Sequence, residues 1–268
     1  MESQIRQIQL KCLEILDIVH GICEDNNIQY SLCGGSVVGA HLYGKCLPWD
    51  DDIDLMMTRE NYNRFITIAP SLLPEGYSML NYQVSDDFIM GLTKVINDNT
   101  TYVQENGIVL GVFIDITVYD KVPTNHFLRW IDMFLMRRSL TVLKGKMSGE
   151  SLKNKVRNFI LDTIWSDKRA FFISFQRVVE LLANTSHYTY SELFGAWAQD
   201  ISYRPSVFEN YAMIEFEGKL YHIVRDYIEY LTTRYNRNDF REPKEKQVPP
   251  HVVFFDSYIP YKNYRKSS

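Results

Sequence analysis

The stretch PWDDDIDLMM, residues 48–57, decides the fold: it places four aspartates within five residues, immediately before an apolar run. Successive side chains of a β-strand point to opposite faces, so alternate residues share one face. If residues 51–57 form a strand, Asp52 and Asp54 point together to one face. The apolar residues on the other face are then Ile53, Leu55 and Met57. Two carboxylates about 7 Å apart along a strand can share or bridge divalent cations.

A third carboxylate, Asp115, interrupts the otherwise apolar run 112–118, VFIDITV. A charge in such a strand costs free energy unless it is paired or bound to a metal ion. If this strand lies beside the first, Asp115 completes a site of three carboxylates. Hard oxygen ligands favour Mg²⁺ or Mn²⁺ over softer metals. We therefore predict that Asp52, Asp54 and Asp115 are both metal ligands and catalytic residues.

The alternative for the acidic stretch is a solvated turn or the start of a helix, where acidic side chains are common. We favour this alternative for Asp50 and Asp51. The apolar neighbours of Asp52 and Asp54 indicate a strand instead. Together with Asp115, they favour catalysis of phosphoryl or nucleotidyl transfer, in which a metal ion neutralises charge on the phosphate under attack.

The sequence Gly34-Gly35-Ser36 lies between a strand predicted over residues 28–33 and a helix predicted over 37–42. Glycines let the backbone turn tightly, and the first amide groups of a helix can bind an anion. Ser36 is a candidate cap for this helix. We predict that Gly34, Gly35 and Ser36 bind phosphate groups of a substrate.

Hydrophobic periodicity outlines the rest of the chain and predicts an α+β fold, in which a mixed β-sheet core is flanked by helices. The predicted helices cover residues 5–22, 59–69 and 222–235, with further helices across 125–183, and the predicted strands cover 28–33, 51–57, 88–96 and 109–119. We divide the chain into a catalytic core (1–122), a mainly helical subdomain (123–200) and a C-terminal segment that packs back on the core (201–268).

Composition excludes several classes of protein. The 268 residues carry a net charge of −4, which gives no reason to expect nucleic acid as a partner. We see neither a signal peptide nor an apolar run of about 18 residues, so we expect a cytoplasmic protein or one attached to the inner face of the membrane. The four cysteines (Cys12, Cys23, Cys33 and Cys46) form no CxxC pair, and we expect buried free thiols rather than a zinc site.

Several motifs together resemble the LicD family of phosphocholine transferases. In chain order they are Gly34-Gly35-Ser36, Gly39-Ala40, the run Pro48-Trp49-Asp50-Asp51-Asp52-Ile53-Asp54, Phe216-Glu217-Gly218, and Tyr230-Leu231-Thr232 with Tyr235. The resemblance implies a nucleotidyltransferase-type core, related to that of the fukutin-type transferases. It also implies that Asp52 and Asp54 are the metal-binding pair and that Asp115 is the third carboxylate. Leu42 stands where the family often has a basic residue, and Lys45 is a nearby substitute.

The resemblance further implies a reaction. Phosphocholine would pass from CDP-choline to a sugar hydroxyl of a bacterial surface glycan, such as teichoic acid or lipopolysaccharide, with release of CMP. The acceptor would be lipid-linked. Two alternatives stay open: a nucleotidyltransferase acting on the hydroxyl of a small molecule, and a non-catalytic protein that associates with a glycan or a membrane.

Two further residues are predicted to contact the donor phosphates or the cytidine. Lys94 lies in the predicted strand 88–96, and His251 follows Pro249-Pro250 in a tail that could fold over the site. The alternative for Lys94 is a solvated lysine on an edge strand. The alternative for His251 is a residue of a surface loop.

Residues 127–157 combine an apolar helical face with a basic cluster. The apolar residues are Phe127, Trp130, Ile131, Phe134 and Leu135. Within residues 137–157 the basic residues are Arg137, Arg138, Lys144, Lys146, Lys153, Lys155 and Arg157, against the single acid Glu150. This combination suits docking on an anionic lipid surface. The alternative, which we favour slightly, is a face that packs on the core.

Overall fold

The computed structural model describes residues 3–84, 91–143, 155, 159, 167–193, 201–241 and 251–265. The helices are α1 (Gln4–Asp25), α2 (Gly34–Tyr43), α3 (Arg59–Leu72), α4 (His126–Leu143), α6 (Lys168–Leu182) and α7 (Tyr227–Tyr235), with short 3₁₀ turns at Pro205–Phe208 and Tyr261–Asn263. The strands are β1 (Ser31–Leu32), β2 (Asp54–Thr58), β3 (Tyr77–Leu80), β4 (Thr93–Gln104), β5 (Val109–Pro123), β6 (Tyr188–Ser191), β7 (Tyr211–Phe216), β8 (Lys219–Val224) and β9 (Val252–Asp256). The predicted α+β class is confirmed.

A mixed sheet of seven strands forms the centre of the fold, with the order β1-β2-β5-β4-β3. β6 pairs with the far end of β5, and β9 pairs with β4. The β2–β5 pair is parallel, whereas the other described pairs of this sheet are antiparallel. β7 and β8 form a separate hairpin. The sheet therefore places β2, β5 and β4 side by side.

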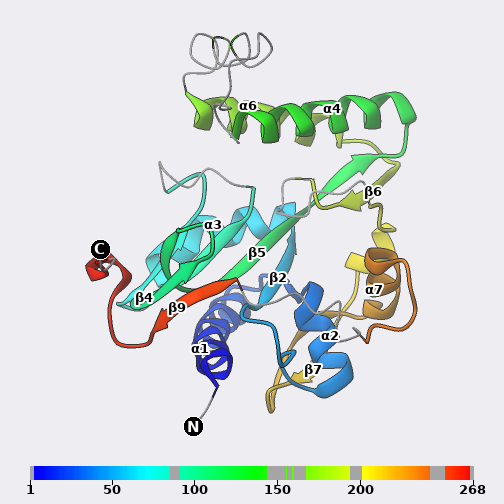
Figure 1. Cartoon of the computed structure of the whole chain (residues 1–268). Coiled ribbons are helices and arrows are strands. Elements are labelled where there is room, and N and C mark those ends of the chain that lie inside the picture. The colour runs from blue at the N-terminus through cyan, green and yellow to red at the C-terminus, as the bar shows by residue number, and fades with distance from the viewer. Residues whose placement is uncertain are drawn as a thin grey trace.

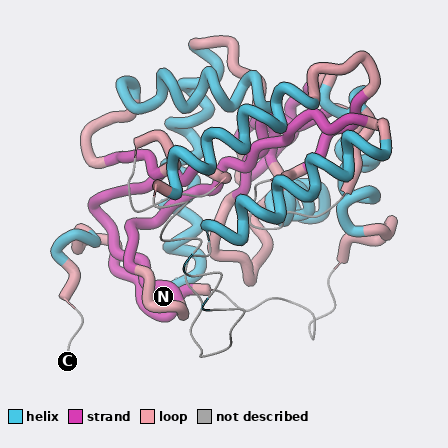
Figure 2. The backbone as a smooth tube through the Cα atoms, turned by 90° about the horizontal axis from the view of Figure 1, so that it is seen from above, coloured by secondary structure: helices cyan, strands magenta, loops and turns pink. Residues whose placement is uncertain are grey.

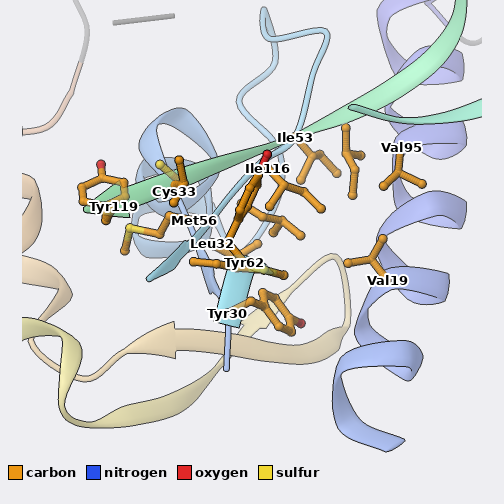
Figure 3. Packing of buried hydrophobic residues seen from close by; sticks show 14 of the residues in the cluster. Val19, Tyr30, Leu32, Cys33, Ile53, Met56, Tyr62, Val95, Ile116 and Tyr119 are labelled. Atoms are coloured by element: carbon orange, nitrogen blue, oxygen red, sulfur yellow. The ribbon is translucent and has the colours of Figure 1, made fainter. Parts of the chain in front are cut away.

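Helix α1 covers one side of the sheet because its apolar stripe repeats every three or four residues. Ser3 caps the helix by accepting a hydrogen bond from the Arg6 backbone N–H at 3.3 Å. Figure 3 shows Val19 of α1 directed toward the sheet, where Ile53, Val95 and Ile116 are fully buried. This core fixes the strands from which the acidic side chains project to the opposite face.

The helical region after β5 is confirmed where the structure describes it. β5 continues beyond the sheet toward α4 and α6, which pack together as a separate layer (Figure 1). Seen from above, helices cross over the strands (Figure 2). The C-terminal part of the chain returns to the sheet through β9, and the Val224 N–H of β8 donates to Ser31 Oγ at 3.0 Å. The three-segment division of the chain stays a prediction.

Several predicted boundaries are wrong. β2 begins at Asp54, so Asp52 lies just before the strand rather than within it. The strand predicted over 88–96 is β4, which begins at Thr93, and residues 85–90 lie outside the described part. The helix predicted from His222 begins only at Tyr227, because residues up to Val224 form the second strand of a hairpin. Glu217 and Gly218 form the turn between β7 and β8, and both have positive φ, which suits a hairpin turn.

The four cysteines are buried and free, as expected from their spacing. Burial raises the pKa of each thiol, so none is poised as a thiolate. In Figure 3, Cys33 lies within the apolar cluster, close to the start of α2. The thiols therefore act as small apolar side chains of the core.

Candidate active site

Three charged residues form a row across three adjacent strands. Asp54 on β2 lies opposite Asp115 on β5, and Asp115 lies opposite Lys94 on β4. Directly paired residues on neighbouring strands project to the same face of a sheet. Asp54 and Asp115 are 61 positions apart in the sequence. The fold nevertheless brings these two acids and the lysine into one line.

Asp52 joins this row from the segment before β2. Residues 51–55 alternate between buried and partly exposed, as an extended chain does, and Asp52 and Asp54 occupy the partly exposed positions. Both line one cavity of about 160 Å³ together with Asp115. The complete lining is Cys33, Asp52, Asp54, Leu92, Lys94, Tyr102, Gln104, Phe113, Asp115, Thr117, Glu192, Arg234 and His251.

Lys94 is not a solvated lysine of an edge strand, so that alternative is wrong. It is 8% exposed, and β4 has neighbours on both sides. Its Nζ lies 2.6 Å from Asp115 Oδ1 and 3.6 Å from the centroid of the Phe113 ring. A desolvated ammonium group held by a carboxylate and an aromatic face has a fixed position.

Negative charge in the cavity is only partly compensated. Burial, followed by the charge of Asp115, raises the pKa of Asp52 to about 6. Burial and the charges of Asp52 and Asp115 raise the pKa of Asp54, which the nearby Arg234 opposes. Four acidic side chains, one lysine and one arginine line the cavity. A cluster with this excess of carboxylates favours a bound cation.

Asp51 is buried rather than solvated, so the prediction of a solvated turn is wrong for it. Only 3% of Asp51 is exposed. Its Oδ2 accepts hydrogen bonds from the Tyr102 hydroxyl at 2.7 Å and from the Val252 N–H at 3.1 Å. Asp51 thereby ties the acidic segment to β4 and β9. Its neighbour Asp50 is partly buried, and burial and the charge of Asp52 raise its pKa.

The glycines and Ser36 lie against the acids in a way that the sequence did not indicate. Helix α2 begins at Gly34 with Cys33 as its N-cap, so Ser36 does not cap it. The Ser36 hydroxyl instead accepts the Asp54 backbone N–H at 2.9 Å. Gly34 has φ +52°, and a Cβ there would lie 3.2 Å from Asp54 Oδ2, whereas a Cβ on Gly35 would lie 2.5 Å from an Asp50 oxygen. These positions therefore leave room for the carboxylates; phosphate binding by Gly34, Gly35 and Ser36 stays a prediction.

His251 reaches the cavity from the C-terminal tail. It immediately precedes β9, and its carbonyl accepts the Glu105 N–H at 3.1 Å. Strand β9 runs beside β4 (Figure 1), and His251 is one of the residues that line the acidic cavity. His251 is exposed, so its side chain is open to a ligand.

Sequence reasoning missed two charged residues of the cavity, Arg234 and Glu192. Arg234 Nη1 donates to Glu192 Oε2 at 3.1 Å and to the Tyr119 hydroxyl at 3.3 Å. Arg234 lies in the segment Tyr230–Tyr235 of α7, whose neighbours carried the family resemblance, and that signal could have found it. Glu192 follows β6 and carried no motif, so only the tertiary fold reveals it.

The apolar residues of α4 divide between two environments. Phe127, Trp130 and Phe134 are 68%, 62% and 43% exposed and stack in sequence, with ring centroids 6.4 and 5.7 Å apart. A core-facing position is therefore wrong for these three, whereas Ile131 and Leu135 are partly buried. Arg137, Arg138 and Lys155 are exposed. The other basic residues of the cluster (Lys144, Lys146, Lys153 and Arg157) lie outside the described residues. Within the described part of the chain, no helix is long and apolar enough to span a bilayer.

The mixed sheet with acids on adjacent strands is the arrangement of a nucleotidyltransferase-type transferase, and comparisons with known proteins agree. A family model described as the LicD/FKTN/FKRP nucleotidyltransferase domain matches residues 27–142, which include Asp52, Asp54, Lys94 and Asp115. The chain is also 29% identical over 274 residues to the lipopolysaccharide cholinephosphotransferase LicD of Haemophilus influenzae, covering 95% of this chain and 98% of that protein. Both comparisons confirm the predicted resemblance to the LicD family of transferases.

Proposed function

We propose that this protein transfers phosphocholine from CDP-choline to a sugar hydroxyl of a bacterial surface glycan and releases CMP. The observation that carries the proposal is the row Asp54–Asp115–Lys94, with Asp52 and Arg234 in the same cavity. The name of the relative from Haemophilus influenzae favours a lipopolysaccharide acceptor. Teichoic acid is the second candidate acceptor, and a lipid-linked precursor of either glycan would present the hydroxyl.

The donor set of the cavity fits Mg²⁺ or Mn²⁺. Asp52, Asp54 and Asp115 offer hard carboxylate oxygens, and the raised pKa of Asp52 and Asp54 records their burial and mutual repulsion. When bound, such an ion would neutralise charge on the phosphates of the donor. We propose these three aspartates as its ligands. Lys94 holds the Asp115 carboxylate, so one oxygen of that group is already oriented by the protein.

The protein groups around the acids can hold a diphosphate donor for in-line attack. The oxygen of the acceptor hydroxyl forms a bond to the phosphorus that carries choline and gives up its proton to a carboxylate of the cavity or to water. The bond from that phosphorus to the CMP oxygen breaks, and CMP departs. Charge on the phosphate oxygens then needs cationic partners. Lys94 and Arg234 line the cavity, and His251 is open to the nucleotide side of a donor. Because these groups are already in place, catalysis needs little beyond positioning of the two substrates.

One incubation separates the proposed reaction from the two alternatives. Purified protein is mixed with Mg²⁺, CDP-choline and lipopolysaccharide from a strain that lacks phosphocholine, and nucleotide products are separated by ion-exchange chromatography. CMP formation that depends on the acceptor supports phosphocholine transfer. Pyrophosphate release from a nucleoside triphosphate indicates nucleotidyl transfer instead. Neither product, with saturable binding of the glycan alone, indicates a non-catalytic protein.

We further propose that the enzyme acts at the cytoplasmic face of a membrane and docks there through α4. The stacked ring ladder Phe127–Trp130–Phe134 offers an apolar surface, and Arg138 lies 5.0 Å from the Phe134 ring centroid. Aromatic rings flanked by arginines suit the headgroup region of an anionic bilayer. Docking would bring the cavity close to an acceptor that is attached to a lipid.

A further inference from the structure

A second cluster of metal-ligating side chains lies outside the acidic cavity. His20 and Glu24 are four residues apart on α1 and therefore share one face of the helix. His222 reaches them from β8. One ring nitrogen from each histidine and one Glu24 oxygen all lie within 4.8 Å of one another. None of the three residues lines the acidic cavity.

The surroundings of the two imidazoles suit metal coordination. His20 Nδ1 lies 2.8 Å from the hydroxyl of the fully buried Tyr30. When Nδ1 carries the proton and donates to this hydroxyl, Nε2 is left with a free lone pair. A ligating histidine generally has its other ring nitrogen held by such a partner.

His222 has one nitrogen that is not committed to the protein. Its Nε2 lies 2.5 Å from Glu24 Oε1, whereas its buried Nδ1 has no hydrogen-bonding partner among the described residues. Small rotations of the exposed Glu24 side chain and of the ring would open space between them for an ion, with metal–ligand distances of about 2.0–2.2 Å.

We propose that His20, Glu24 and His222 bind a zinc ion, with water as the fourth ligand. Two imidazoles and one carboxylate form a ligand set that suits Zn²⁺, in contrast to the oxygen ligands that Mg²⁺ prefers.

The zinc ion would fasten the β7–β8 hairpin to α1. Besides the His222–Glu24 pair itself, two ion pairs join these elements: Lys219 Nζ–Asp17 Oδ2 at 2.6 Å and Arg6 Nη1–Glu217 Oε1 at 2.7 Å. A metal bond would add a third connection near the other end of the hairpin. The chain continues from β8 directly into α7, which carries Arg234. Occupancy of the site would therefore stabilise the elements beside the acidic cavity.

Thermal unfolding of the full chain, prepared without a polyhistidine tag and treated with chelator, tests this site. A small excess of Zn²⁺ should raise the Tm by about 4 °C or more, whereas Mg²⁺ should not reproduce that rise. The rise should disappear in Glu24→Gln, His20→Ala and His222→Ala. It should persist in His187→Ala, an exposed histidine elsewhere, and in Asp52→Asn/Asp54→Asn, which removes the acids of the other cavity.

Cobalt gives a readout that does not depend on how well each variant folds. Co²⁺ bound to this ligand set should show visible d–d absorption that saturates at one equivalent and is lost on addition of Zn²⁺. Glu24 is exposed, so Glu24→Gln should stay folded and still weaken Co²⁺ binding by at least about tenfold, the lower end expected for lost metal contacts. Absence of a Zn²⁺-dependent rise in Tm, or an equal rise in Glu24→Gln and in the native protein, would overturn the proposal and leave a plain His222–Glu24 ion pair. Neither result bears on transfer activity.

Discussion

Lys94 lies directly opposite Asp115 on the neighbouring antiparallel strand, and its ammonium nitrogen is 2.6 Å from Asp115 Oδ1. Across the parallel strand on the other side, Asp115 lies opposite Asp54. Asp115 therefore stands between a lysine and a second acid. The ion pair with the lysine helps a sheet of mostly apolar strands to hold several charges on one face, and the row defines which substitutions should matter.

The three aspartates should each be essential to turnover without being essential to the fold. Asp52→Asn, Asp54→Asn and Asp115→Asn should lower kcat by at least about 100-fold, because each removes a negative charge that would hold the proposed metal ion. CMP release measures the rate, and circular dichroism checks the fold. Asp25→Asn, at the exposed end of α1, is the matched control and should retain activity. Near-normal turnover in any one of the three would remove that residue from the site.

Lys94 and His251 should contribute to donor binding in different degrees. Lys94→Ala should weaken CDP-choline binding and lower kcat/KM by about 100-fold, because the lysine is buried beside Asp115. His251→Ala should cost about tenfold, since that side chain lies at the exposed wall of the cavity. Isothermal titration with CDP-choline measures the affinity of each variant, and CMP release measures its kcat/KM. Unchanged affinity and rate in a variant would mean that its residue is a bystander.

Mg²⁺ affinity should fall as the pH drops from 7 to 5. The pKa of Asp52 is raised to about 6, and that of Asp54 is also raised, so protons compete with the metal in mildly acidic solution. Because these pKa values are raised, the two carboxylates are fully available to the metal ion only at a higher pH. Titration of Mg²⁺ at pH 5, 6 and 7, with enzyme turnover or Tm as the signal, measures the effect. An affinity that does not change across this range would contradict the assignment of Asp52 as a ligand.

Asp132 on α4 should destabilise the protein at neutral pH. It is fully buried, no described residue hydrogen-bonds to its carboxylate, and burial raises its pKa to about 7. The native state therefore keeps a proton that the unfolded state has lost, and stability falls as pH rises from about 4 to 7. Asp132→Asn should raise the Tm at pH 8 by about 2–4 °C. The gain should shrink at pH 5, and an equal gain at both values would contradict the raised pKa.

The aromatic ladder of α4 should mediate binding to anionic vesicles. Co-sedimentation with phosphatidylglycerol-containing liposomes at low salt should capture the protein, and Phe127→Ser/Trp130→Ser should reduce the bound fraction severalfold. Replacing Arg137, Arg138, Lys144 and Lys146 by Glu should abolish binding, and added salt should weaken it. Neutral phosphatidylcholine vesicles are the control. Protein that stays in the supernatant with anionic vesicles would rule out this role for α4.

The residue pattern by itself determined the class of fold, the acidic motif and its chemical character. The alternation of side chains around Ile53 predicts a strand from local periodicity. The isolated Asp115 in an apolar run indicates a site because burying a charge costs free energy. Both signals act over a few residues. The tertiary structure alone decided which acids meet. The parallel pairing of β2 with β5 set Asp54 beside Asp115, and the return of α7 brought in Arg234. These contacts depend on strand order and register, which arise from packing of the whole chain and leave no signal within one segment.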